Sequence, residues 1–96
     1  MAVKKITCVC PAGIGSSLIL AMNVEKVLDK MGKGDIKIDH IALGECTTGL
    51  CDLFVVSADI VEQVSQYGPV VPVKNLVDRN HIEEVLTEYF NNNPEE

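Results

Sequence analysis

The stretch CVCPAGIGSS, residues 8–17, places two cysteines, two glycines and two serines close together. A cysteine thiolate is a strong nucleophile, but an ordinary thiol has a pKa of about 8.5 and is mostly protonated at neutral pH. The sequence predicts a helix that begins near Ser16, and the positive potential at its N-terminus would favour the thiolate of Cys10. We therefore expect Cys10 to act as a nucleophile.

The residues after Cys10 have the composition of a phosphate-binding loop. Gly13 and Gly15 allow backbone N–H groups to converge on an anion, and the hydroxyls of Ser16 and Ser17 can cap the helix and donate to phosphate oxygens. The loop would then hold a phosphoryl group on the sulfur of Cys10. The alternative is a plain strand-to-helix turn in which Cys10 is a small buried apolar residue.

The loop departs from two established phosphate-binding patterns and partly matches a third. It has no lysine for a G-x-x-x-x-G-K-[ST] motif, and it lacks the third glycine of a dinucleotide fingerprint. In a phosphatase-type loop, cysteine is followed by five residues, an arginine and a hydroxyl residue, and here Ser16 stands at the arginine position and Ser17 at the hydroxyl position. Without arginine the loop should stabilise a hydrolytic transition state poorly, yet it can still hold a phosphoryl group and pass it on.

Strands and helices alternate along the chain, and this order predicts how the loop is positioned. The pattern predicts strands at 4–10, 36–43, 52–57 and 69–73, helices at 16–31, 58–66 and 80–90, and a helical turn within 44–50. Asn80, with Glu83 three residues later, is expected to open the last helix. Such alternation implies one parallel sheet covered on both faces, with the proline-flanked strand 69–73 at an edge. Ligands of such sheets bind at the carboxyl ends of the strands, where Cys10 lies.

Length and composition indicate one globular domain over residues 1–96, with a frayed tail at 91–96. No apolar stretch approaches the roughly 20 residues of a membrane span, and the first residues lack a secretory signal, so we expect a cytosolic protein whose cysteines are thiols. The net charge of −6 and the single arginine, Arg79, argue against nucleic acid as a partner. Any bound phosphate must then be held mainly by backbone dipoles.

The other cysteines are expected to be structural. Cys8 lies two residues before Cys10, so strand alternation places both on one face of the sheet, and Cys8 is predicted to be a buried core thiol. Together with Cys46 and Cys51, these residues could suggest a four-thiolate zinc site. Their spacing fits no common zinc pattern well, and we predict no metal site.

Two histidines and one aspartate are the remaining candidates for chemistry. His40 falls in a strand pattern and His81 at a helix start, so both are predicted to be structural or solvated rather than acids or bases. Asp59 follows the third strand and could help to position a partner at the productive end of the sheet. We favour the simpler role of a helix N-cap for Asp59.

Several segments together resemble one family, the cytosolic IIB components of the bacterial phosphoenolpyruvate-dependent sugar phosphotransferase system (PTS). Within the lactose/cellobiose-like IIB superfamily, the chain is most similar to the ascorbate-specific IIB proteins. The resemblance spans nearly the whole chain and consists of VC-x-x-G-x-G-SS at 9–17, ALGE at 42–45, DLFVVS followed by ADI, and VVPVKNL before the last helix.

The resemblance implies a three-layer α/β domain with four parallel strands in the order 2-1-3-4, flanked by helices on both faces. It implies that Cys10 accepts a phosphoryl group from a phosphohistidine of the IIA protein and donates it to the sugar carried by the membrane protein IIC. The implied phosphate cradle consists of Pro11, Ala12, Gly13, Ile14, Gly15, Ser16 and Ser17. Relatives often have small polar residues or glycine where this chain has Pro11 and Ala12.

The resemblance also implies a substrate, a location and partners. The sugar is expected to be L-ascorbate, with galactitol or another polyol as the alternative, and the chemistry requires no metal or organic cofactor. The protein should be cytoplasmic and associate transiently with the membrane through IIC. Two other functions suit the same loop and fold: a low-molecular-weight phosphatase or arsenate-reductase-like enzyme, and a non-catalytic regulatory module.

Overall fold

The computed structural model describes residues 3–10, 16–75 and 77–92, without the side chains of Cys10, Ser16 and Ser17. Its strands and α-helices are β1 (Lys5–Cys10), α1 (Ser16–Lys30), β2 (Lys37–Ala42), β3 (Leu53–Ser57), α2 (Val61–Val64), β4 (Val70–Val73) and α3 (Arg79–Asn92). The 3₁₀-helices are η1 (Leu43–Glu45), η2 (Ala58–Ile60) and η3 (Ser65–Tyr67). The helix expected at 58–66 is thus a single α-helical turn between two 3₁₀ turns.

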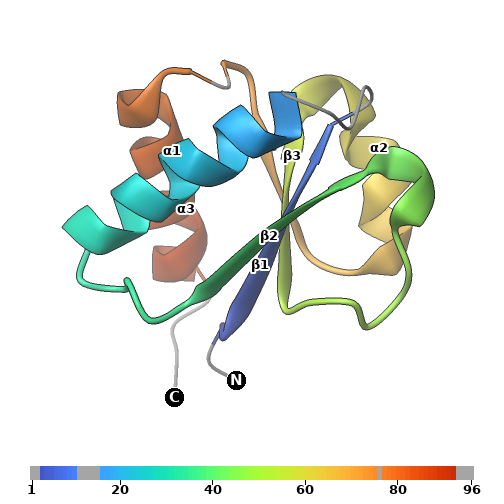
Figure 1. The fold of residues 1–96 in the computed structure, drawn as a ribbon, viewed down its shortest axis with the longest axis horizontal. Helices are drawn as coiled ribbons and strands as arrows, with labels where there is room; N and C mark the ends of the chain where they lie inside the picture. The colour runs from blue at the N-terminus through green and yellow to red at the C-terminus, as the bar shows by residue number, and fades with distance from the viewer. Residues whose placement is uncertain (1–2, 11–15, 76, 93–96) are drawn as a thin grey trace.

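The four strands form one parallel sheet in the order β2-β1-β3-β4. α1 and α3 pack on one face of this sheet, and α2 with its flanking 3₁₀ turns packs on the other (Figure 1). β4 lies at an edge, as its prolines predicted. The fold expected from the sequence and from the family resemblance is therefore confirmed.

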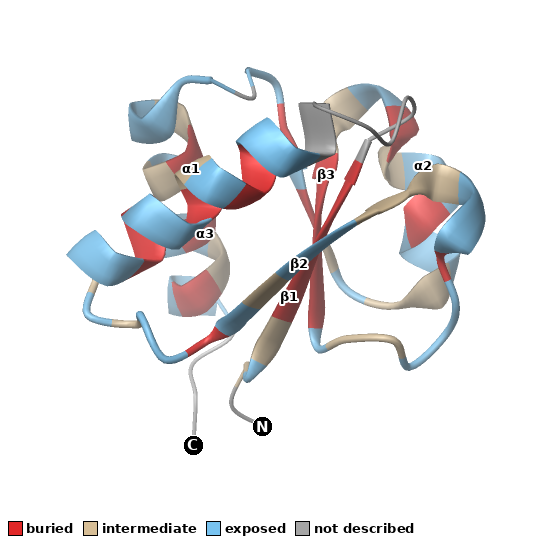
Figure 2. Cartoon of the chain, in the orientation of Figure 1, coloured by how far each residue is buried: buried red, intermediate tan, exposed pale blue. Residues whose placement is uncertain are grey.

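Strand alternation divides the core into two clusters, one on each side of the sheet. Ile6, Cys8 and Val55 belong to the cluster beneath α1 and α3, whereas Val9 and Phe54 belong to the cluster beneath α2. All five are fully buried, and the buried residues line the inner strands (Figure 2). The prediction that Cys8 is a core thiol is confirmed.

The end of α1 is set by Gly32, which has a φ of +78°. The Lys33 N–H donates to the Leu28 carbonyl at 2.8 Å, and the Gly32 N–H donates to the Asp29 carbonyl at 3.2 Å. These two bonds form the Schellman pattern, which satisfies the last carbonyls of a helix and turns the chain away. The chain leaves α1 at this point and returns as β2.

The start of α3 differs from the sequence prediction. Oδ1 of Asp78 accepts a hydrogen bond from the His81 N–H at 3.2 Å, and the Asp78 carbonyl accepts one from the Ile82 N–H at 3.0 Å. Asp78 is therefore the N-cap, and Asn80 already lies inside the helix. A carboxylate that reaches the third backbone N–H caps this helix more directly than the predicted pair of Asn80 and Glu83.

Thr7 provides a test of the packing between β1 and α2. Its side chain is fully buried, and within the described part of the chain its hydroxyl has no hydrogen-bond partner. Replacing Thr7 with valine keeps the branched shape and removes the unsatisfied polar group, so Thr7→Val should raise the free energy of unfolding by about 1 kcal/mol. Urea denaturation measures this change, and a destabilised variant would show that the hydroxyl has a partner.

Candidate active site

Cys10 is the last residue of β1 and lies opposite Ala42 of β2 in the sheet register. Because β1 has β2 on one side and β3 on the other, its carboxyl end lies in the middle of the sheet edge where ligands of parallel sheets bind. Only five residues separate Cys10 from Ser16, the first residue of α1. The backbone thus places the predicted nucleophile directly before a helix N-terminus.

The N-terminus of α1 has the electrostatic character that the predicted chemistry needs. α1 is 15 residues long and has no acidic residue in its first turn, so no carboxylate there offsets the partial positive charge of the helix dipole. This potential favours a thiolate or a phosphoryl group near the helix start. The cradle residues 11–15 and the side chains of Cys10, Ser16 and Ser17 lie outside the described residues, and their roles stay predictions.

Asp59 lies at the same edge of the sheet, after the end of β3. It is exposed and sits within η2, and its Oδ1 accepts a hydrogen bond from the hydroxyl of Ser57. Ser57, not Asp59, precedes the 3₁₀-helix, so the predicted N-cap role of Asp59 is wrong. The end of β3, the sheet neighbour of β1, and the following η2 therefore place a hydroxyl–carboxylate pair at this edge, a contact that sequence spacing alone did not indicate.

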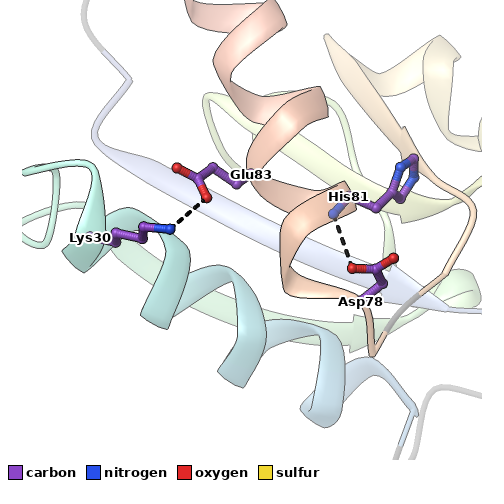
Figure 3. A network of polar contacts seen from close by, with 4 residues as sticks. All are labelled: Lys30, Asp78, His81 and Glu83. Carbon is purple, nitrogen blue, oxygen red and sulfur yellow. Dashed lines mark hydrogen bonds and ion pairs between the residues drawn. The ribbon is translucent and has the colours of Figure 1, made fainter.

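His81 joins the end of β4 to the start of α3. Its Nε2 accepts a hydrogen bond from the Lys74 N–H at 3.0 Å, while its own backbone N–H donates to Asp78 (Figure 3). These two bonds hold the connection between β4 and α3 in place. The structural role predicted for His81 is confirmed, although nothing in the sequence identified Lys74 as the partner.

His40 is exposed on β2 and lies opposite Cys8 in the sheet register. Its backbone N–H donates to Oδ1 of Asp39 at 2.8 Å. β2 is an edge strand, and its His40 side chain faces solvent rather than the core. The solvated position predicted for His40 is confirmed.

The remaining cysteines do not form one site with Cys8. Cys8 is buried on the face of the sheet that α1 and α3 cover, whereas Cys46 and Cys51 pack on the α2 face. The sheet between them excludes the four-thiolate site that the sequence raised. Burial raises the pKa of the Cys46 thiol, and Cys51 and Glu45 nearby add to this rise, so Cys46 stays protonated at neutral pH.

No group of three or more histidine, cysteine, aspartate or glutamate residues within ranges 3–10, 16–75 and 77–92 is placed to hold a metal ion. The Cys51 Sγ donates to the Leu53 carbonyl at 3.2 Å. Cys51 thus has a backbone partner near the start of β3.

Arg79 is the only arginine of the chain, and it begins α3. Its side chain lines a groove of about 300 Å³ between α1 and α3, together with Lys26 and Lys30. The arginine that a phosphatase-type loop requires is absent from the sequence of the loop, where Ser16 takes its position. The one arginine of the chain instead lines the groove between α1 and α3.

Comparison with known proteins decides the family. A sequence profile of the family described as "PTS system, Lactose/Cellobiose specific IIB subunit" matches residues 5–88, which is most of the chain and includes the loop after β1. The chain belongs to this IIB family. The IIB protein is also similar to the ascorbate-specific PTS system EIIB component of Mycoplasma pneumoniae, with 26% identity over 87 residues that make up 85% of this chain and 90% of the relative.

Family membership confirms the resemblance found in the sequence and gives the general function. The IIB protein is a component of a sugar phosphotransferase system, and such components are phosphotransferases that work with IIA and IIC partners. This assignment favours phosphoryl transfer over the phosphatase alternative. None of the helices in the described residues is long and apolar enough to span a bilayer.

Proposed function

We propose that this IIB protein carries a phosphoryl group on Cys10 between a phosphohistidine of IIA and the sugar bound to IIC. The Cys10 thiolate attacks phosphorus in line and the S–P bond forms. The N–P bond breaks as its electron pair returns to the ring nitrogen, and the proton carried by the other ring nitrogen leaves a neutral imidazole on IIA. A sugar hydroxyl then attacks the same phosphorus, loses its proton to a base, and displaces the thiolate. Atoms and charges balance without a metal or an organic cofactor.

The position of Cys10 is the observation that supports this proposal best. Cys10 ends the inner strand β1 at the carboxyl edge of the sheet, and five residues separate it from the start of α1. The start of α1 supplies backbone N–H donors and a positive potential without an acidic residue in the first turn. The proposed cradle at 11–17 would use these donors to balance the equatorial oxygens of the phosphoryl group.

L-Ascorbate is the sugar that we propose for this system, with galactitol or another polyol as the alternative. The support is the similarity to a relative whose name states that it is ascorbate-specific. We propose a cytoplasmic location with transient association at the membrane through IIC, because both the donor and the acceptor must reach the same sulfur.

Mass spectrometry of the phosphorylated protein tests the proposal. Incubation with IIA that has been charged from phosphoenolpyruvate should add one phosphate to the intact protein, and peptide mapping under non-acidic conditions should place it on Cys10. The adduct should disappear when IIC and the correct sugar are added. A protein that gains no phosphate from any charged IIA would be a regulatory module rather than a carrier.

The missing arginine leads to a prediction about hydrolysis. The wild-type protein should release no p-nitrophenol from p-nitrophenyl phosphate above the rate of a Cys10→Ser variant. The reason is that Ser16 stands where a phosphatase-type loop has the arginine that stabilises its transition state. Steady turnover that depends on Cys10 would identify a phosphatase instead.

A further inference from the structure

A basic groove of about 300 Å³ lies between the second half of α1 and the first turns of α3. Its lining includes Lys26 and Lys30 from α1 and Arg79 from α3, so three of the eight basic residues of the chain surround one groove. Glu83 is the only acidic residue in the lining. Three positive charges and one negative charge give the groove a net charge of +2, in a chain whose net charge is −6.

The three cations of the groove differ in how far their charge is already neutralised. Nζ of Lys30 forms an ion pair with Oε1 of Glu83 at 3.1 Å, which links α1 to α3 (Figure 3). This pair occupies the one carboxylate of the lining. Within the described part of the chain, no carboxylate forms an ion pair with Lys26 or Arg79. The groove therefore presents two exposed, uncompensated positive charges, one from each helix.

The chemistry of the lining suits a small molecule that combines a dianion with hydroxyl groups. The volume is at the lower end of the range of small-molecule sites. The guanidinium of Arg79 offers a planar fork to two phosphate oxygens, and the ammonium of Lys26 adds a second charge from the other helix. The Asn80 amide and the Glu83 carboxylate line the same groove and can bond hydroxyl groups, and Val27 adds apolar surface for a carbon skeleton.

We propose that this groove binds a phosphorylated sugar, with the phosphate between Lys26 and Arg79. Such a molecule is the product of the proposed transfer, so the choice of a sugar phosphate rests on the proposed function, whereas the groove itself does not. Lys26 lies ten residues after Ser16, which is about 15 Å along the axis of α1. The groove is thus separate from the cradle at 11–17, and the carrier would hold its product without blocking Cys10.

An NMR titration of the uncharged protein, without IIA, tests the inference. Glucose 6-phosphate is the probe, and at low salt it should shift the backbone amide signals of residues 26–30 and 79–83. Inorganic phosphate should bind at the same place with an affinity roughly tenfold lower, because it makes no hydroxyl contacts. Glucose should cause no shifts. Equal affinity for the two phosphates, or shifts confined to residues 10–18, would overturn the inference.

Two double variants with the same net charge separate the groove from the charge of the whole protein. Lys26→Gln with Arg79→Gln should weaken binding of glucose 6-phosphate by roughly tenfold or more, because both charge-assisted contacts are lost. Lys4→Gln with Lys37→Gln also changes the net charge from −6 to −8, at exposed positions outside the groove, and should bind as wild type does. An equal loss in both variants would show that only overall charge matters and would overturn the inference.

The outcomes for the groove and for Cys10 can be told apart. A protein that takes up phosphate from charged IIA but does not bind glucose 6-phosphate overturns this inference and leaves the proposed function intact. Binding of glucose 6-phosphate in the groove of a protein that charged IIA never phosphorylates supports the site, while it removes the proposed function and with it the identification of the ligand as a product.

Discussion

Cys10→Ser is expected to lower phosphate uptake from charged IIA by roughly 10³-fold or more. A serine hydroxyl is hardly ionised at neutral pH, so the positive potential at the start of α1 has no thiolate to stabilise. Cys10 is the last residue of its strand, and the change removes no residue from the described core clusters. The variant should therefore keep its circular dichroism spectrum and its unfolding midpoint while it loses the phosphate adduct.

Cys51→Ser is the matched control for this experiment. Cys51 is half-buried, and its Sγ donates to the Leu53 carbonyl, a bond that a serine hydroxyl can also make. This variant should take up phosphate at the wild-type rate. Uptake that survives in Cys10→Ser, or that is lost in Cys51→Ser, would move the phosphorylated residue elsewhere in the chain.

Phe54→Ala should have the largest effect on stability, with a loss of about 3–5 kcal/mol in the free energy of unfolding. Phe54 is fully buried on β3, within the cluster that α2 covers. The backbone at Gly68 passes so close that a Cβ there would lie 3.5 Å from Cε2 of the ring. Truncation would leave a cavity within this cluster, because the Gly68 backbone has no side chain that could fill it.

Urea denaturation followed by circular dichroism measures this loss. Thr87→Ala is the control, because Thr87 is exposed on α3 and its replacement should change the free energy of unfolding by less than about 0.5 kcal/mol. A domain of this size has a total stability of about 5–15 kcal/mol, so Phe54→Ala should be partly unfolded at physiological temperature. A small shift for Phe54→Ala would show that the α2 side of the core repacks.

Elements with a clear periodicity were predictable from the sequence, and those without one were not. The helical spacing of Leu20, Val24, Val27 and Leu28 and the apolar run of β3 correspond to α1 and β3. The segment 58–67 is too short for periodicity to separate an α-helix from 3₁₀ turns. The cap of α3 was missed because Asp78 and Asn80 are both good caps, and the choice depends on where β4 ends.

The candidate site was predictable only in part, for a physical reason. The position of Cys10 before a helix follows from local sequence and from the rule for parallel sheets, and the backbone agrees with it. The contacts of Ser57 with Asp59 and of His81 with Lys74 depend on how strand ends and helix starts meet in space. The spacing of residues along the sequence does not show which strand end contacts which helix start.

The two outer strands of the sheet bear on self-association. A strand with unpaired backbone groups can recruit the same strand of a neighbouring molecule and begin an aggregate. In β2 this is opposed by the exposed charges of Lys37 and Asp39, and in β4 by the exposed Pro72, which has no N–H to donate. The protein should consequently stay dispersed when concentrated, because neither border of the sheet offers a template on which a further copy could be added.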